Sequence, residues 1–343
     1  MTEHAAKPAT RAGVVLIGRN EGQRLVRCLA SVCQDGRPVV YVDSGSTDTS
    51  CDEARAHGAL VVDLDMSIPF SAARARNEGW AHLLAEHPEL DYVQFVDGDC
   101  EVDERWIPLA MELLDTREAV VAVCGYRRER YPERSLYNRV CDVEWQAGDA
   151  GEVGCVGGDV MVRASGLRQT GGYNSAVIAA EDDEFGIRLR QVTGGKLWRL
   201  DAPMTLHDAN MMEARQWWQR AKRCGHGYAQ VNHLHGAPPE RYFEDNLKRS
   251  LVWGAIAPAA AVVLSVPTLG LSLAVLGRYP ISAARAAQHV RKRGFSWKHS
   301  LAWGLSCAAA PIPEALGAAK FYIDRLRERA PEIIEYKTSD DAS

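Results

Sequence analysis

The sequence predicts an α/β protein in which a mostly parallel central sheet is flanked by helices and followed by an apolar helical segment near the C-terminus. Short apolar runs rich in strand-forming residues alternate with helical patterns over residues 13–124. Alternation at this spacing implies right-handed crossovers and strands covered on both faces. A second observation is that residues 251–277 contain no charged side chain, a length of apolar chain sufficient to reach across a bilayer.

The alternating part divides into five strands and four helices. We expect the strands at residues 13–17, 39–42, 60–64, 92–96 and 119–124, and the helices at residues 21–33, 48–57, 71–85 and 103–114. No Gly-x-Gly-x-x-Gly pattern follows the first strand, which removes the main support for a dinucleotide-binding Rossmann domain. From Tyr126 the pattern loosens into loops and mixed segments, as expected for a substrate-binding half built onto the sheet.

Composition and charge exclude several classes of protein. The chain has 343 residues, a net charge of -5 and a pI near 6.1, which gives no general attraction to nucleic acid. Basic residues are nevertheless dense at residues 127–139 and 215–223. Nine scattered cysteines, never spaced as Cys-x-x-Cys, argue against a zinc site and a disulfide framework and fit a reducing cytoplasm. Residues 1–12 lack the apolar core of a secretion signal, and we interpret them as a disordered leader.

The segment from Asp91 to Asp99 is the most informative stretch of the chain. An apolar strand ends there abruptly in Asp97-Gly98-Asp99. Because ligands bind beyond the carboxyl ends of strands in such sheets, both carboxylates are expected at the mouth of a site. A hard cation such as Mg²⁺ or Mn²⁺ takes carboxylate ligands and leaves positions for substrate phosphates. The alternative is a polar turn after a strand, in which aspartates are also typical.

Other polar segments accompany these two aspartates along the chain. In order they are Arg19-Asn20-Glu21, Val42-Asp43-Ser44-Gly45-Ser46-Thr47-Asp48, Ala75-Arg76-Asn77-Glu78-Gly79 and Glu181-Asp182-Asp183. The first two follow strands, and the third places an arginine on a helix within reach of a phosphate or ribose. Each has a structural alternative: a helix cap, a surface arginine, or carboxylates that favour the positive end of a helix.

In this order and spacing the segments resemble family 2 glycosyltransferases. The resemblance extends through Gly157-Gly158-Asp159 and Gly171-Gly172-Tyr173, which are similar to the acceptor-side loop and the glycine-glycine-aromatic turn of that family. It covers residues 13–230 of the chain. It implies a GT-A fold with a nucleotide-sugar-binding half at residues 13–125 and an acceptor-binding half at residues 126–245.

The resemblance also implies roles for individual residues. Asp99, Asp97 and His207 would hold a Mn²⁺ or Mg²⁺ ion, Asp182 would be the general base, and Glu181 would orient it or the acceptor. The nucleotide sugar would contact Ile17, Arg19, Glu21, Asp43, Arg76, Asp97 and Gly98, and the acceptor would contact Gly158, Asp159, Trp217 and Trp218. A structural hydrogen-bonding role is the alternative for the histidine, and a helix anchor at a lipid surface is the alternative for the two tryptophans.

Two departures from the family pattern limit what the resemblance implies. Ser44 stands where many relatives have a second acidic residue, which leaves guanosine and thymidine diphosphates open beside uridine. The segment Gln216-Trp217-Trp218-Gln219-Arg220 differs from the Gln-x-x-Arg-Trp of processive synthases, which puts polymerisation in doubt. The expected reaction is a single displacement with inversion, in which the cation neutralises the departing diphosphate and one carboxylate takes the proton of the acceptor hydroxyl.

Residues 246–330 form the apolar C-terminal part. Pro258 and Pro267 interrupt its uncharged run, and a second apolar stretch lies at residues 301–319. Basic residues flank the first run on both sides, which favours a hairpin that enters a membrane and returns. The alternatives are a pair of buried helices packed on the catalytic domain and a dimer face. Residues 331–343 are expected to form a polar tail.

These features predict a metal-dependent inverting glycosyltransferase at the cytoplasmic side of the inner membrane, peripheral or re-entrant. The expected donor is a nucleotide diphosphate sugar, the expected acceptor a lipid-linked or cell-surface glycan, and nucleic acid is not an expected partner. The alternatives are a soluble glycosyltransferase for a small-molecule acceptor, a non-catalytic GT-A domain that binds sugar nucleotides, and a nucleotidyltransferase. The last would need a glycine- and lysine-rich loop after the first strand, where the chain has Gly18-Arg19-Asn20-Glu21-Gly22.

Overall fold

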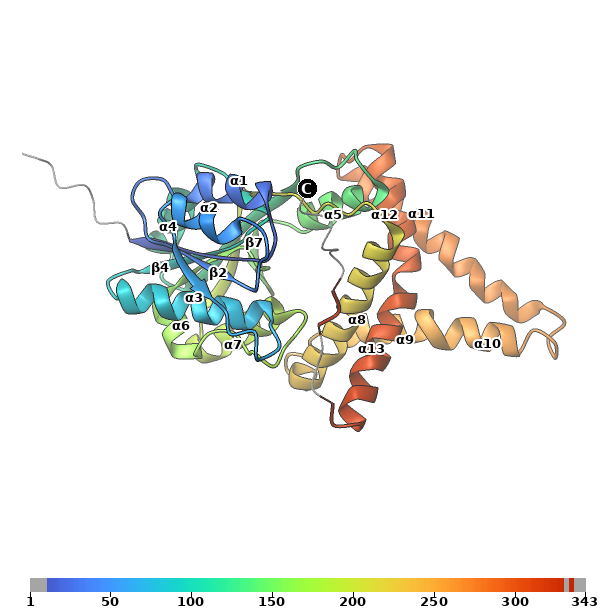
Figure 1. Ribbon diagram of the computed structural model, residues 1–343. Coiled ribbons are helices and arrows are strands. Elements are labelled where there is room, and N and C mark those ends of the chain that lie inside the picture. Colours follow the sequence, from blue (N-terminus) through green and yellow to red (C-terminus); the bar gives the residue numbers. More distant parts are fainter. Residues whose placement is uncertain (1–10, 330–332, 336–343) are drawn as a thin grey trace, which may run out of the picture.

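The computed structural model describes residues 11–329 and 333–335 of the chain. A mixed sheet forms the centre of the N-terminal part, and a layer of helices lies beside it (Figure 1). The strand order is β3-β2-β1-β4-β8-β6-β9-β5, with β7 paired to β9. The strands are β1 (Ala12–Gly18), β2 (Val39–Asp43), β3 (Leu60–Asp63), β4 (Tyr92–Asp97), β5 (Cys100–Val102), β6 (Val120–Glu129), β7 (Gly151–Val153), β8 (Val160–Arg163) and β9 (Lys196–His207).

The parallel half of the sheet confirms the alternating pattern predicted from the sequence. β1 pairs in parallel with β2 and β4, and β2 pairs in parallel with β3. The helices between these strands are α1 (Gln23–Val32), α2 (Ser50–Ala56) and α3 (Ala72–Glu86), and α4 (Trp106–Thr116) lies between β5 and β6. Val15 and Leu16 are both fully buried although successive side chains of a strand point to opposite faces, so the sheet is covered on both sides.

The parallel pairing also aligns the ends of the strands that carry the predicted site. Gly18 of β1 lies opposite Asp43 of β2, and Ile17 of β1 lies opposite Asp97 of β4. The carboxyl ends of parallel strands meet at one edge of a sheet, which is where α/β proteins bind ligands. The loops that follow these strands therefore bring their polar side chains to one place.

The sheet as a whole is mixed rather than mostly parallel, which corrects the sequence-based expectation. β8 lies antiparallel between β4 and β6, and β5 and β7 run antiparallel to β9. β6 and β9 are parallel to each other. The direction of β8 is not readable from its residues, because Val160, Met161 and Val162 are all buried and form the continuous apolar run that is typical of a parallel strand.

β6 extends five residues beyond its predicted end at residue 124. Its last residues pair with the end of β9, with Arg127 opposite Thr205 and Glu129 opposite His207. The charged residues at this end hid the strand from the apolar pattern. The extension matters for the site because it places Arg127 and Glu129 beside His207.

The C-terminal helices form a layer of their own beside the sheet (Figure 1). α8 (Ala214–His235) and α13 (Pro311–Leu326) lie side by side, and α5 (Leu136–Gln146), α9 (Glu244–Leu251) and α12 (Trp297–Ala309) complete the layer. Two further helices, α6 (Ala164–Thr170) and α7 (Glu181–Thr193), pack against each other and against the sheet.

Between α9 and α12 the chain forms a helical hairpin. One arm consists of the π-helical turn η1 (Val252–Ile256) and α10 (Ala257–Val263), and the other of the 3-10 helix η2 (Leu271–Gly277) and α11 (Arg278–Lys292). Pro258 lies in the first turn of α10, which continues η1 directly, and Pro267 lies in the connection between the arms. The apolar run is therefore not one straight rod, as predicted, but the break lies at the connection and not at Pro258. Within residues 11–329 and 333–335, no helix has both the length and the apolar character needed to cross a membrane.

The predicted leader lies mostly outside the described residues. Of residues 11 and 12, which the sequence analysis assigned to the leader, Ala12 begins β1 opposite Tyr92, and Arg11 forms ion pairs with Asp91 and Asp115. These two residues therefore belong to the folded domain. Of the predicted polar tail, the structure describes residues 333–335.

Candidate active site

A cleft of about 340 Å³ opens at the carboxyl ends of β1 and β4. Residues of the sheet, of α3 and α7 and of the helical layer line it together. Predicted site residues in its wall are Ile17, Arg19, Glu21, Arg76, Asp97, Gly98, Asp99, Glu181 and His207. The structure therefore brings most of the predicted set to one place.

Asp97 stands at the end of β4 between the buried Arg76 and the partly buried Arg127. Its Oδ1 accepts a hydrogen bond from Nη2 of Arg76 at 2.8 Å, and its Oδ2 lies 3.5 Å from Nη2 of Arg127. Burial raises the pKa of Asp97, but the two guanidinium groups outweigh burial and hold the pKa below its usual value. The carboxylate is therefore ionised at neutral pH, and the arginines bring two positive charges to the wall of the cleft.

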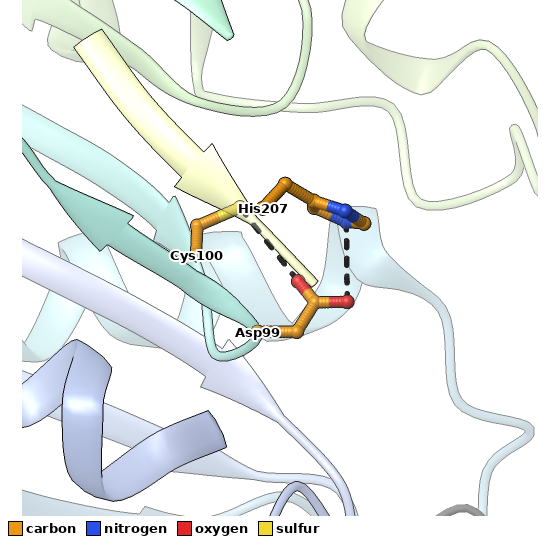
Figure 2. Close-up of side chains that lie close together, drawn as sticks. All are labelled: Asp99, Cys100 and His207. Carbon is orange, nitrogen blue, oxygen red and sulfur yellow. Dashed lines mark hydrogen bonds and ion pairs between the residues drawn. The ribbon is translucent and has the colours of Figure 1, made fainter. Parts of the chain in front are cut away.

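Asp99 lies between Cys100 and His207 (Figure 2). Its Oδ2 is 3.2 Å from Nε2 of His207, and its Oδ1 is 3.7 Å from Sγ of Cys100. Burial, with a contribution from the negative charge of Asp159, raises the pKa of the Cys100 thiol, so the sulfur stays protonated and is a weak metal ligand. The carboxylate and the imidazole remain as donors. This pair suits a transition-metal ion such as Mn²⁺ better than Mg²⁺, which prefers oxygen ligands.

His207 is held in position by its neighbours at the end of β9. Its ring packs edge-on against Trp145 at a centroid distance of 4.4 Å. Its second ring nitrogen, Nδ1, lies 3.8 Å from Oε2 of Glu129, beyond hydrogen-bond distance. Burial lowers the pKa of His207, but the carboxylate of Asp99 and that of Glu129 raise it by more. The imidazole therefore sits between two carboxylates, of which Asp99 is the closer.

The loops after β1 and β2 are tied together at another part of the cleft. The backbone N–H of Asn20 donates to Oγ of Ser46 at 2.9 Å. Asp43 holds the same turn, because its Oδ2 accepts a hydrogen bond from the backbone N–H of Ser46 at 2.7 Å. Ser44 lines the cleft, whereas Asp43 is not among the described residues of its wall. A direct contact between Asp43 and a nucleotide therefore stays a prediction.

The two carboxylates that begin α7 face different surroundings. Glu181 lines the cleft, where its Oε1 accepts a hydrogen bond from Nη1 of Arg76 at 2.9 Å. Arg76 thus bridges Asp97 and Glu181. Asp182 is not among the described wall residues and instead faces the predicted acceptor-side loop, where a Cβ on Gly157 would lie 3.9 Å from its Oδ2.

The surroundings of Asp182 alter its acidity. Burial, followed by the negative charges of Asp183 and Glu181, raises the pKa of Asp182 to about 7. The backbone N–H of Asp183 donates to Oδ1 of Asp182 at 3.0 Å, and the side chain of Asp183 accepts a hydrogen bond from Tyr242 at 2.6 Å. A carboxylate with a pKa near neutrality is suited to taking up a proton during a reaction.

The predicted acceptor residues separate into two groups. Gly158 and Asp159 lie next to the arginines: a Cβ on Gly158 would come within 2.6 Å of Nη2 of Arg76, and Oδ2 of Asp159 lies 2.6 Å from Nη2 of Arg127. Asp159 is only 1% exposed, so it positions Arg127. A side chain at position 158 would displace the bridging arginine.

The second group, Trp217 and Trp218, lies on α8. Trp217 donates a hydrogen bond to Oγ of Ser306 at 3.0 Å and lines a separate cavity of about 280 Å³ within the helical layer. Trp218 is exposed on the surface. Neither tryptophan lines the cleft, and contact of these side chains with an acceptor stays a prediction.

The sequence analysis missed several cleft residues. They are Arg24, Arg127, Trp145, Arg220 and Arg223. The dense basic segments at residues 127–139 and 215–223 were the available signal for three of them. Which basic residues face the cleft depends on the pairing of β6 with β9 and on the position of α8, and neither is contained in a local pattern.

A short C-terminal segment also reaches the cleft, where Ile333 and Glu335 form part of the wall. Oε1 of Glu335 lies 3.3 Å from Nη1 of Arg19, and the two side chains are 58% and 43% exposed. An ion pair this exposed contributes about 0–1 kcal/mol. An anionic ligand that binds Arg19 would therefore displace Glu335 at little cost.

Comparison with known sequences matches the same region. The model of glycosyl transferase family 2 matches residues 14–163, a segment that contains Asp43, Arg76, Asp97 and Asp99. A TPR repeat-containing protein of Synechococcus elongatus is 31% identical over 131 residues, which are 38% of this chain and 30% of that protein. The match thus spans less than a third of the length of that relative.

Comparison with solved structures extends the likeness over most of the chain. A mannosyltransferase from Pyrobaculum calidifontis, solved in complex with GDP-Man and Mn²⁺, has a TM-score of 0.59 at 17% identity over 90% of this chain and 87% of that one. S. aureus TarS, residues 1–349, has a TM-score of 0.51 at 14% identity over 88% and 90% of the two chains. At such low identity these likenesses establish the fold. They show that the chain has the GT-A fold, and residues 14–163 of it are similar to glycosyl transferase family 2.

Proposed function

We propose that the protein transfers a sugar from a nucleoside diphosphate sugar to an acceptor hydroxyl, with a divalent cation held by Asp99 and His207. The observation that carries this proposal is the charge arrangement at the end of β4. Asp99 faces an imidazole at 3.2 Å, while Asp97, on the other side of Gly98 in the sequence, is held by Arg76 at 2.8 Å. Cation ligands and guanidinium groups thus adjoin in one cleft, which is what a metal-bound diphosphate requires.

The residues of the chain have separate tasks in this reaction. When bound, the cation neutralises the charge that develops on the departing diphosphate. Arg127 and Arg76 hold Asp97 and add positive charge beside that position. Arg76 also ties Asp97 to Glu181, so the donor-side and acceptor-side walls are kept at a set separation. In this proposal residues 13–125 bind the donor and residues 126–245 bind the acceptor.

Asp182 is the proposed general base. Its pKa of about 7 leaves a large fraction ionised at neutral pH and allows it to keep the proton of the acceptor hydroxyl once taken. Its position toward Gly157, in the predicted acceptor-side loop, supports this role. One base without an enzyme nucleophile implies a single displacement, with inversion at the sugar carbon.

The acceptor is proposed to be a lipid-linked or cell-surface glycan. The support is the apolar helical layer beside the cleft and the cavity lined by Trp217, which adjoins the cleft because Arg220 lines both. For the donor, Ser44 leaves guanosine open, and the Pyrobaculum mannosyltransferase is solved with GDP-Man. Guanosine diphosphate sugars are therefore the first donors to test.

A panel of nucleotide sugars tests the proposal through metal-dependent thermal stabilisation of the full-length protein. The matching donor is expected to raise the Tm in the presence of Mn²⁺ and to lose this effect in EDTA, since a ligand at a hundred times its Kd stabilises by about 2.7 kcal/mol. The free sugars serve as controls. Equal stabilisation with and without metal by every donor would contradict the assigned cation site.

The position of Asp182 outside the cleft wall favours one second candidate, a domain that binds the sugar nucleotide without transferring it. Hydrolysis or transfer assays with the stabilising donor separate the two. Mn²⁺-dependent release of nucleoside diphosphate supports the enzyme. Tight binding without turnover over a range of acceptors supports the binding domain.

A further inference from the structure

The helical hairpin between α9 and α12 projects beyond the rest of the molecule (Figure 1). Its tip exposes large apolar side chains: Val263 is 73% exposed, Val266 82%, Leu269 94% and Leu271 78%. Soluble monomers rarely gather such side chains on one projecting element, because each contact with water is unfavourable. The tip therefore requires an apolar environment from outside the chain.

Most hydrogen-bond donors of the tip are paired within it. The hydroxyls of Ser265, Thr268 and Ser272 donate to the carbonyls of Val262, Leu264 and Ala261 at 2.6, 2.6 and 2.7 Å. Local carbonyls also accept from the backbone N–H groups of Leu264, Ser265, Thr268, Leu269, Gly270, Leu271 and Leu273. Internal pairing of this kind is what a hydrocarbon environment demands, since it offers no hydrogen bonds in return.

A belt of aromatic and basic residues marks where the apolar tip begins. The guanidinium of Arg278 lies 4.6 Å from the ring centroid of Trp253, and the hydroxyl of Tyr279 donates to the carbonyl of Trp253. Trp, Tyr and Arg are the side chains that prefer the headgroup region of a bilayer. Beyond this belt, residues 254–277 carry no charge.

The length of the tip matches the hydrocarbon thickness of one leaflet. At 1.5 Å per residue, the helical arm from Trp253 to Leu264 spans about 16 Å. The hydrocarbon core of a bilayer is about 30 Å thick, so half of it is about 15 Å. A hairpin of this length enters one leaflet and returns without crossing the membrane.

The positive charge of the residues around the hairpin indicates which kind of surface the hairpin binds. Residues 246–313 contain eight Lys and Arg residues and no Asp or Glu. The net charge of the whole chain is -5, so the residues outside 246–313 have a net charge of -13. Arg285, Arg291 and Lys292 of α11 are exposed. A second copy would bring the same positive charge against this one, whereas an anionic lipid surface complements it.

We propose that residues 254–277 insert into one leaflet of an anionic bilayer, with Trp253, Arg278 and Tyr279 at the level of the headgroups. α9 leads into the hairpin and packs on α13, and α13 packs on α8, which supplies Arg220 and Arg223 to the cleft. Docking therefore places the helical layer, which supplies one wall of the cleft, next to the lipid surface. This surface exists whether or not the chain transfers sugar, so the inference goes beyond the proposed function.

Flotation of the full-length protein with vesicles in detergent-free buffer tests the proposal. The wild type is expected to float with vesicles of phosphatidylcholine and phosphatidylglycerol and to bind less to phosphatidylcholine alone. The double variant Val266→Asp/Leu269→Asp should lower the bound fraction by about tenfold or more, since charge at the inserted tip opposes burial in hydrocarbon. The matched control is Leu326→Asp, at a side chain 84% exposed at the end of α13, which should float like the wild type.

The variant Arg291→Glu/Lys292→Glu tests the contribution of positive charge. It should bind the anionic vesicles more weakly, while its smaller binding to phosphatidylcholine vesicles stays unchanged. The Tm of each variant without ligand shows that it is folded, independently of any donor binding. A wild type that remains in the soluble fraction overturns the proposal, as does a tip variant that floats like the wild type. A wild-type dimer that the tip variant converts to a monomer, without vesicle binding, assigns this face to a second copy instead.

Discussion

At the scale of single residues, the two aspartates after β4 differ in their surroundings although one glycine separates them. Asp97 is neutralised by Arg76 and Arg127, whereas Asp99 faces the imidazole of His207. A cation gains more from a carboxylate that guanidinium groups do not already neutralise. We therefore expect the proposed cation site to depend more on Asp99 than on Asp97.

Replacing Asp99 with asparagine is expected to abolish Mn²⁺-dependent binding of nucleoside diphosphates. The amide has nearly the same shape but carries no charge, so the fold should persist. Titration calorimetry with GDP and UDP, with and without Mn²⁺, measures the effect. Asp201→Asn, at an exposed position of β9, is the matched control. Parent-like Mn²⁺-dependent binding by Asp99→Asn would place the cation elsewhere.

Asp182 is expected to impose an acid limb near pH 7 on kcat/KM for transfer. Its pKa is raised to about 7, and a base must be ionised to act, so activity should fall as the pH drops below that value. Asp182→Asn should keep donor affinity and lose about 10²–10⁴-fold in transfer. Asp183→Asn removes a neighbouring negative charge and should move the limb to lower pH. Unchanged turnover in Asp182→Asn would transfer the role to Glu181 or Asp183.

Because Glu335 forms an ion pair with Arg19, we expect its carboxylate to compete weakly with an anionic ligand for Arg19. Glu335→Gln removes the carboxylate that meets Arg19 at 3.3 Å, so nucleoside diphosphates should bind more tightly. The exposed pair contributes about 0–1 kcal/mol, which limits the gain to about fivefold. Calorimetry compares this variant with Glu328→Gln, at an exposed position shortly after α13. Weaker binding by Glu335→Gln would mean that the carboxylate assists the ligand.

At the scale of elements, the position of α8 depends on how closely α13 approaches it. A Cβ on Gly225 of α8 would collide with the backbone of Glu314, and one on Gly317 of α13 would collide with the backbone of Lys222. The two helices therefore meet at glycines on both sides. This contact matters for the site because α8 carries Arg223, a residue of the cleft wall.

Adding a single methyl group where α8 and α13 cross is expected to destabilise the protein. Gly317→Ala is expected to lower the free energy of unfolding by about 1–3 kcal/mol, the usual cost of overpacking, despite the better helix propensity of alanine. Urea unfolding followed by circular dichroism measures the loss. Gly277→Ala, at a glycine with open space around it, is the control. An unchanged midpoint would show that the helices separate without penalty.

At the scale of the whole molecule, charge is strongly segregated. Eight basic residues and no acidic ones lie in residues 246–313, although the net charge of the chain is -5. Such a molecule presents one positive face to its surroundings, and the field of that face decides which surfaces it approaches.

The segregated charge predicts retention on a cation-exchange resin at pH 7 and low salt. Arg291→Glu/Lys292→Glu should elute at clearly lower salt, because both residues belong to the positive face. The pair Arg55→Glu/Arg105→Glu changes the net charge by the same amount at exposed positions outside that face, and should shift elution less. Equal shifts for the two pairs would show that only net charge matters.

Much of this architecture is present in the sequence itself. The alternation of apolar runs and helical patterns predicts β1 to β4 and the helices after them. For β1, β2 and β4 the reason is that these strands are buried on both faces, so their residues form continuous apolar runs. Asp97, Asp99 and Arg76 were recognisable because they follow or flank those elements at short range. Pro267 likewise indicated the turn of the hairpin, since proline disfavours continuation of a helix.

The tertiary structure alone decided which residues share the cleft. Arg127 reaches it because β6 continues to Glu129 through pairing with β9, a contact between segments far apart in the chain. Glu181, rather than Asp182, lines the wall because Arg76 draws it there from another helix. Pairing of distant strands and of buried charges depends on the whole chain packing at once, and no local pattern of residues encodes it.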